Sequence, residues 1–148
     1  MKTVQLGVVA LSALVAFSAC HSKAEAGVRV IKSGDNYKIS AQVDKDKSNP
    51  LKGVLELSIE PTNGWKMEKD KGPSTITLEP ADTMKFKKTK WVKADASWDS
   101  SGKKILYKIP YSLNAKGDHA VKLKFRFVLC NDKLCQMKRF DLDYSISG

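Results

Sequence analysis

The sequence Cys130-Asn131-Asp132-Lys133-Leu134-Cys135 joins two stretches in which apolar and polar residues alternate. Before it, the apolar residues at alternate positions are Val121, Leu123, Phe125, Phe127 and Leu129. After it, they are Phe140, Leu142, Tyr144 and Ile146. A period of two is typical of half-buried strands, and the polar connection between the cysteines has the length of a hairpin turn. The stretch therefore predicts an antiparallel β-hairpin.

Placing Cys130 opposite Cys135 fixes the register of the whole hairpin. The apolar pairs become Val121–Tyr144, Leu123–Leu142 and Phe125–Phe140, and the charged pairs become Lys122–Asp143 and Lys124–Asp141. Such pairs each stabilise a ladder by roughly 0.2–1 kcal/mol, and a slip of one residue would expose both apolar faces. The register brings the cysteines within disulfide range. It also places Arg126 opposite Arg139, which implies either splayed strands or an anionic group between them.

Both cysteines fall on the polar face of the predicted hairpin. Closing so short a loop removes only about 2 kcal/mol of chain entropy from the unfolded state. Arg126, Lys133 and Arg139 lie nearby and favour a thiolate, although Asp132 opposes them. This arrangement suits a disulfide that exchanges with other thiols. The alternative is a structural disulfide that reinforces the hairpin of an exported protein.

The amino-terminal residues 1–19 have the features of a signal peptide. Lys2 precedes an apolar stretch that is too short and wrongly flanked for a membrane-spanning helix. The stretch ends Phe17-Ser18-Ala19-Cys20, which resembles a bacterial lipoprotein box, so we expect Cys20 to be lipidated and to become the new amino terminus. The alternative is ordinary cleavage after Ala24-Glu25-Ala26. Both possibilities export the protein.

Export sets the expected location of the chain. We expect residues 20–27 to form a lipid-anchored tether and residues 28–148 to form one domain, facing the periplasm from a membrane of the bacterial cell envelope. Disulfides persist there, and Cys130 and Cys135 are the pair that remains once Cys20 is modified.

The chain carries a formal net charge of +10 over its 148 residues. Export excludes nucleic acid as a partner and leaves an anionic membrane surface, lipopolysaccharide or acidic proteins. The densest lysine cluster lies in residues 85–93, where we expect a solvated strand edge. We expect the protein to be a monomer.

The rest of the chain from Val28 onward has the pattern of β-strands, and no window has a helical period. The expected strands are 28–31, 37–43, 55–59, 76–78, 84–86, 91–92 and 105–113, followed by the hairpin. Residues 94–102 are expected to be a loop that carries Trp98. Short strands separated by regular turns predict an all-β sandwich or barrel.

Four stretches carry a resemblance to a known family. They are Asn63-Gly64-Trp65, Ile76-Thr77-Leu78-Glu79-Pro80, Ile105-Leu106-Tyr107-Lys108-Ile109-Pro110 and the Phe127-Val128-Leu129-Cys130…Cys135 hairpin. In this order they resemble the amino-terminal periplasmic domain of the DsbD family of thiol–disulfide interchange proteins. The resemblance implies an immunoglobulin-like antiparallel β-sandwich in which Cys130 and Cys135 relay electrons between thioredoxin-like partners. It also implies a cap loop with a shielding aromatic residue, for which Trp98 is the candidate.

Three functions are compatible with these observations. The main interpretation is an exported thiol–disulfide exchange module, an oxidoreductase or electron-relay domain that needs no cofactor. The second is a non-enzymatic envelope lipoprotein, a binding or scaffold domain with a structural disulfide. The third is a copper or zinc carrier that uses Cys130, Cys135, His119 and Met137, although the sequence has no paired metal-binding motif and we expect no metal site.

Overall fold

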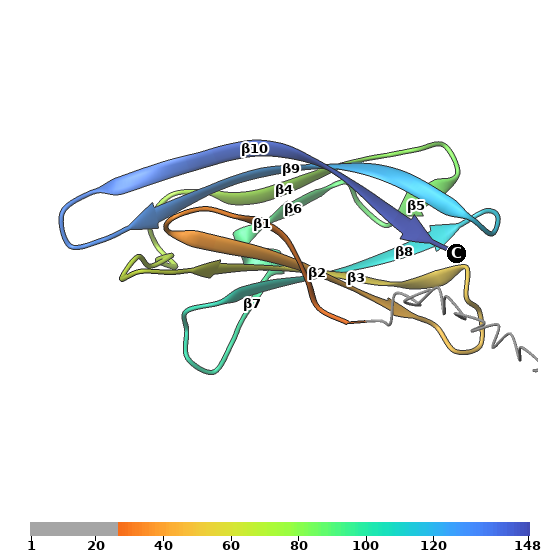
Figure 1. Ribbon diagram of the computed structural model, residues 1–148, viewed down its shortest axis with the longest axis horizontal. Helices are drawn as coiled ribbons and strands as arrows, with labels where there is room; N and C mark the ends of the chain where they lie inside the picture. The colour runs from red at the N-terminus through yellow and green to blue at the C-terminus, as the bar shows by residue number, and fades with distance from the viewer. Residues whose placement is uncertain (1–26) are drawn as a thin grey trace, which may run out of the picture.

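The computed structural model describes residues 27–148, so the expected signal peptide, the lipidation site Cys20 and residues 20–26 of the tether lie outside the described residues. Strands make up almost all of the regular structure in this part of the chain (Figure 1). The elements in chain order are β1 (Arg29–Ser33), β2 (Tyr37–Lys45), β3 (Lys52–Pro61), β4 (Ser74–Pro80), β5 (Met84–Phe86), β6 (Lys90–Val92), the 3-10 turn η1 (Lys93–Asp95), β7 (Ser97–Trp98), β8 (Ile105–Leu113), β9 (Asp118–Cys130) and β10 (Cys135–Ser147).

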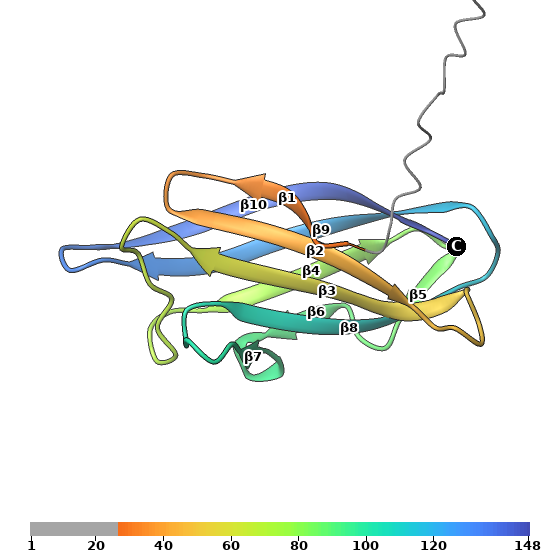
Figure 2. The same cartoon turned by 60° about the horizontal axis from the view of Figure 1, so that its bottom comes forward.

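The strands form two antiparallel sheets that pack face to face. The first has the order β1-β2-β3-β8-β5, with β7 also paired to β8, and the second has the order β10-β9-β4-β6. Figure 1 shows the second sheet above the first, and Figure 2 turns the molecule so that the strands of the first sheet come forward. This architecture confirms the all-β antiparallel sandwich that the sequence predicts.

The core lies between the two sheets and consists of the apolar residues at alternate strand positions. The fully buried side chains are Ile39, Leu55, Leu57, Ile59, Ile76, Leu78, Ile105, Tyr107, Ile109, Leu123, Phe127 and Leu129. Both sheets contribute to this set, because each strand turns every second residue inward.

The strands β9 and β10, which we call the cysteine hairpin, pair over their entire length from Asp118–Ser147 to Cys130–Cys135. Every cross-strand pair expected from the sequence is present, so the predicted register is confirmed. The Arg126–Arg139 pair belongs to the same continuous ladder. The strands therefore do not splay at the two like charges.

The lysine-rich stretch 85–93 crosses from one sheet to the other. It supplies β5 at the edge of the first sheet and β6 at the edge of the second, and Lys85, Lys87, Lys88 and Lys90 are exposed there as expected. Residues 94–102 are not simply a loop, because η1 begins before them and β7 pairs with β8. Asp95 stabilises η1, because its carboxylate accepts a hydrogen bond from the Val92 amide at 2.8 Å and forms a salt bridge with Lys88 at 2.5 Å.

Candidate functional site

The disulfide between Cys130 and Cys135 closes the tip of the cysteine hairpin, with an S–S distance of 2.07 Å. Figure 1 shows this tip protruding from one end of the sandwich. The turn between the cysteines is also closed by hydrogen bonds of its own. The Asn131 amide donates to the Leu134 carbonyl at 2.9 Å, and Asn131 Oδ1 accepts from the amides of Lys133 and Leu134 at 2.9 and 2.8 Å. The turn geometry therefore does not depend on the disulfide alone.

The two cysteines differ in accessibility. Cys130 is only 3% exposed, whereas Cys135 is an exposed residue. The backbone of Cys130 pairs with that of Lys66, because each amide donates to the other residue's carbonyl at 2.8 Å. Although both cysteines belong to the polar side of the hairpin, as the sequence predicts, only Cys135 lies open to an incoming thiol.

Lys66 belongs to the connection between β3 and β4, residues 62–73, which we call the covering loop. Met67 anchors this loop, because its side chain is buried in the hydrophobic core. Gly72 adopts a φ of +68°, and a Cβ atom there would come within 2.5 Å of a Val128 methyl group. Glycine therefore permits both the backbone conformation of the loop and its close approach to β9.

The covering loop is also bound by the ammonium group of Lys93. Lys93 Nζ donates to backbone carbonyls at 2.9 Å from Glu68, 3.3 Å from Lys69, 3.2 Å from Lys71 and 2.7 Å from Gly72. Burial lowers the pKa of Lys93, and the negative charge of Asp70 opposes that shift. The expectation of a solvated strand edge is therefore wrong for Lys93, which ties the covering loop to η1.

Trp98, the expected shielding residue, lies in β7 and pairs with Ile105. Its ring lies 5.6 Å from Lys69 Nζ in the covering loop, at a distance suited to a cation–π contact. The segment whose backbone contacts Cys130 is the covering loop itself. Shielding of the disulfide by Trp98 thus stays a prediction.

Two arginines lie on the polar side of the cysteine hairpin near the disulfide. Arg126 Nε and Arg139 Nε each donate to Met137 Sδ, at 3.5 and 3.3 Å. Met137 follows Cys135 by two positions on β10, so this sulfur and the two guanidinium groups lie on the same side of the sheet as the disulfide.

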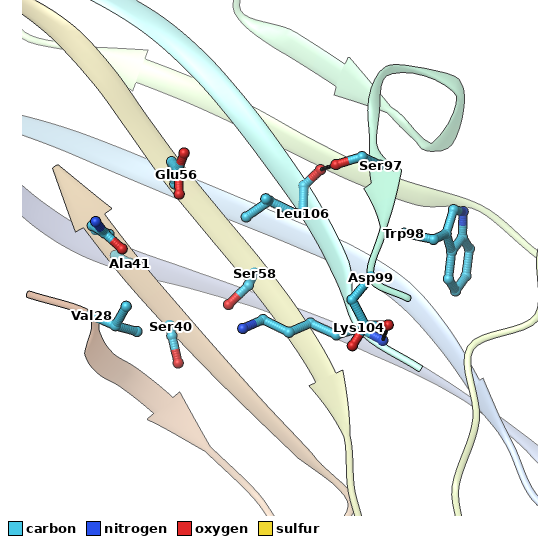
Figure 3. Close-up of a pocket in the computed structure, with 11 residues that line it drawn as sticks. Val28, Ser40, Ala41, Glu56, Ser58, Ser97, Trp98, Asp99, Lys104 and Leu106 are labelled. Carbon is cyan, nitrogen blue, oxygen red and sulfur yellow. Dashed lines mark hydrogen bonds between the residues drawn. The ribbon is translucent and has the colours of Figure 1, made fainter. Parts of the chain in front are cut away.

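A hollow lies on the outward face of β2, β3 and β8, away from the cysteines (Figure 3). It has a volume of about 250 Å³ and is lined in part by the buried Ser40 and Ser58 and by Lys104. Figure 3 shows the Trp98 indole directed away from these serines. Its charged residues Glu56, Asp99 and Lys104 carry both signs and no cysteine borders it, so it is separate from the disulfide site.

Of the residues considered for a metal carrier, His119 is not brought together with Cys130, Cys135 and Met137. His119 is buried near the far end of β9, where Nδ1 is 2.6 Å from Thr83 Oγ1 and Nε2 is 2.8 Å from the Ala115 carbonyl. Cys130 ends the same strand, about 36 Å away at the usual strand rise. Across residues 27–148, no three His, Cys, Asp or Glu side chains gather in a way that would hold a metal ion.

The described part of the chain also contains no helix that is long and apolar enough to span a membrane.

No family model matches the sequence. A search of curated proteins also finds no match. Among solved structures, the chain is similar to the GAE domain of GGA2p from Saccharomyces cerevisiae, with 11% identity, a TM-score of 0.44, and coverage of 80% of this chain and 97% of that one. The yeast GGA1 GAE domain has 13% identity, a TM-score of 0.44, and coverage of 80% and 98%.

The N-terminal periplasmic domain of ScsB from Proteus mirabilis is a further similar structure. It has 17% identity and a TM-score of 0.36, and the match covers 80% of this chain and 49% of that one. At these identities and scores the similar structures do not assign a function, which has to be argued from the site itself.

Proposed function

We propose that this protein is an exported thiol–disulfide exchange module that relays electrons through Cys130 and Cys135. The observation that carries the proposal is the unequal exposure of the two cysteines, since Cys135 is exposed and Cys130 is 3% exposed. The short, self-closed turn between them supports it, because a crosslink that closes so short a loop stabilises the fold by only about 2 kcal/mol, at the low end for disulfides.

Accessibility decides which of the two cysteines reacts with the partner. A thiolate of a reduced dithiol partner attacks Cys135 Sγ, the Cys130–Cys135 bond breaks, and its electron pair leaves on Cys130 Sγ. The second partner thiolate attacks the partner sulfur of the mixed disulfide and releases Cys135 as a thiolate. The partner is then oxidised to a disulfide and the module holds two thiols. In the reverse sense, Cys135 attacks an oxidised partner and Cys130 resolves the mixed disulfide.

The proposal includes a location and partners. The features of residues 1–20 support export with Cys20 as a lipid anchor, and an envelope location facing the periplasm would keep the pair in an oxidising compartment. A DsbD-type amino-terminal domain fits the position of the cysteine pair on the last hairpin of a β-sandwich. Thioredoxin-like proteins are the partners we propose.

A binding or scaffold domain with a structural disulfide is the second candidate. The observation that favours it is the burial of Cys130 beneath the covering loop, where its backbone is paired on both sides. The two candidates differ in one measurable property, because a structural disulfide resists reduction and an exchanging one does not.

The first test is the reduction potential of the pair, measured by equilibration in glutathione and dithiothreitol buffers. The full chain carries Cys20→Ser, so that Cys130 and Cys135 are its only cysteines. We expect a value between roughly −120 and −270 mV, the range of known exchange proteins. A value below about −300 mV, together with a marked loss of stability on reduction, would instead support the structural role.

The second test compares two single variants in that background. Cys130→Ser leaves the exposed thiol and Cys135→Ser leaves the buried one, so the first is expected to react faster with a neutral disulfide reagent and to trap more mixed disulfide. Equal reaction rates would contradict the roles assigned to the two cysteines.

A further inference from the structure

Arg126 and Arg139 are held opposite each other on the polar side of the cysteine hairpin. Like charges directly opposite in a ladder are destabilising, and these two are kept in place by the continuous pairing of β9 and β10, in which the neighbouring Phe125 and Phe127 are buried. Within residues 27–148, neither guanidinium group forms a salt bridge. Their Nε groups donate only to a thioether sulfur, which is a weak acceptor.

The two arginines border a shallow hollow of about 340 Å³ on the outward face of the second sheet. The residues that line it are Thr75, Thr77, Lys90, Lys124, Phe125, Arg126, Arg139, Phe140 and Asp141. Four of them are cations and one is a carboxylate. Lys124 is already bound to Glu79 at 2.6 Å, whereas Lys90 and the two arginines have no salt bridge among the described residues.

We propose that this hollow binds an acidic segment of a partner protein. Two adjacent guanidinium groups, each able to donate two parallel hydrogen bonds, match the geometry of carboxylate side chains. A bound carboxylate would also remove the repulsion between Arg126 and Arg139. The Thr75 and Thr77 hydroxyl groups add neutral donors beside the arginines.

The position of the hollow indicates that its partner is the same protein that exchanges thiols with the Cys130–Cys135 pair. This inference rests on the proposed function. Cys135, Met137 and Arg139 occupy alternate positions on the same side of β10. At the usual strand rise, about 13 Å separates Arg139 from Cys135. Leu134 and Met137 are 48% and 44% exposed beside the disulfide and offer apolar contact area. A partner with carboxylates at that distance from its reactive cysteine would contact the arginines of the hollow and the disulfide at the same time.

The arrangement of charges favours a local acidic segment over an anionic membrane. Beyond Arg139, the outward positions of β10 are Asp141 and Asp143, and Glu79 lies across the sheet. A flat anionic surface would meet these exposed carboxylates as well as the arginines. Asp141 borders the hollow, but a short segment can place its carboxylates against Arg126 and Arg139 and stay clear of Asp143 and Glu79, which lie beyond it.

Direct binding tests the proposal without any redox step. The probes are three fluorescent ten-residue peptides without cysteine: one rich in Glu and Asp, one rich in Gln and one rich in Lys. The protein is the full chain carrying Cys20→Ser. We expect the acidic peptide to bind best at low salt, and Arg126→Gln/Arg139→Gln to weaken it roughly tenfold. The control Lys45→Gln/Lys47→Gln removes the same charge from the β2–β3 turn at the other end of the sandwich (Figure 1) and should leave binding nearly unchanged.

Two results would overturn the proposal. One is an equal loss in the arginine and control variants, which would assign binding to net charge. The other is preferential binding to phosphatidylglycerol vesicles that depends on the arginines, without preference for the acidic peptide.

Exchange kinetics separate this proposal from the proposed function. The same peptides, each with one cysteine, are compared with dithiothreitol as reductants of the Cys130–Cys135 bond. Ready reduction by dithiothreitol with a salt-sensitive, arginine-dependent preference for the acidic peptide supports both proposals. Ready reduction without that preference overturns only the docking site. Resistance to dithiothreitol overturns only the exchange function, because the binding of the cysteine-free peptides still tests the hollow.

Discussion

The two sides of the cysteine hairpin obey the same alternation but have different roles. On the inner side, Leu123, Phe127 and Leu129 are completely buried and meet the opposing sheet. On the polar side, Arg126 and Arg139 face each other without a salt bridge among the described residues. The inner side thus fixes the register. The register in turn places Arg126 opposite Arg139, a contact that the polar side by itself would not favour. Residues available for chemistry lie on the side that contributes less to stability.

The largest expected effect comes from the inner side. Phe127→Ala should lower the free energy of unfolding by about 3–5 kcal/mol, since the ring is fully buried and has edge contacts with Tyr37 and Phe140 at 5.6 and 5.9 Å. Its sequence neighbour on the polar side is the control, because Arg126→Gln should change stability by no more than about 0.5 kcal/mol. Urea denaturation of both variants measures the difference. Similar losses would remove the distinction between the two sides.

The disulfide should have an intermediate effect on stability. Cys130→Ser/Cys135→Ser is expected to lose about 2 kcal/mol, the chain entropy that a short loop removes from the unfolded state. Urea denaturation of this variant beside the oxidised and reduced parent protein, all with Cys20→Ser, gives the value. A loss as large as that of Phe127→Ala would mean that the disulfide is a main support of the fold.

The fold and the cysteine pair follow from short-range patterns in the sequence. Alternation and the placing of Cys130 opposite Cys135 together give the register of the hairpin, because only one register satisfies both. The burial of Cys130 does not follow, since it depends on the backbone of Lys66, which is distant in the chain. The role of Lys93 cannot be predicted from the sequence for a related reason. Its partners are backbone carbonyls, which every residue has, so no pattern of side chains marks them.

Lys93 connects the fold to the accessibility of the site. Lys93→Met keeps most of the length of the side chain and removes the ammonium group, so the carbonyls of the covering loop lose their shared donor. We expect a loss of about 1–2 kcal/mol and faster reduction of the disulfide by dithiothreitol, because Cys130 becomes less protected. Lys85→Met changes an exposed lysine of the same stretch and should alter neither quantity. Unchanged reduction kinetics in Lys93→Met would show that the loop does not control access.

A smaller effect belongs to a polar contact inside the core. Tyr107 Oη lies 2.7 Å from Ser74 Oγ, and burial raises the pKa of Tyr107 above its ordinary 10.0. The unfolded chain therefore ionises this phenol first, so its contribution is complete below pH 10.0 and is lost as the pH rises toward the folded pKa. Tyr107→Phe should cost about 1 kcal/mol at neutral pH and make the alkaline loss of stability shallower. An unchanged alkaline slope in pH-dependent denaturation would contradict this assignment.

The smallest effect is expected from the ion pair on the polar side. The Lys124 ammonium donates to Glu79 at 2.6 Å, and this hydrogen bond lowers the pKa of the Glu79 carboxyl below its ordinary 4.5. The pair therefore stabilises the fold above pH 4.5, and its contribution disappears as the pH falls through the folded pKa. Both groups are open to solvent, so salt screens the interaction. Glu79→Gln should weaken the acid dependence of stability at low salt and have no measurable effect in 1 M salt, conditions under which the loss in Phe127→Ala persists. If the effect of Glu79→Gln survives high salt, the polar side supports the fold directly, and the separation of roles between the two sides is incomplete.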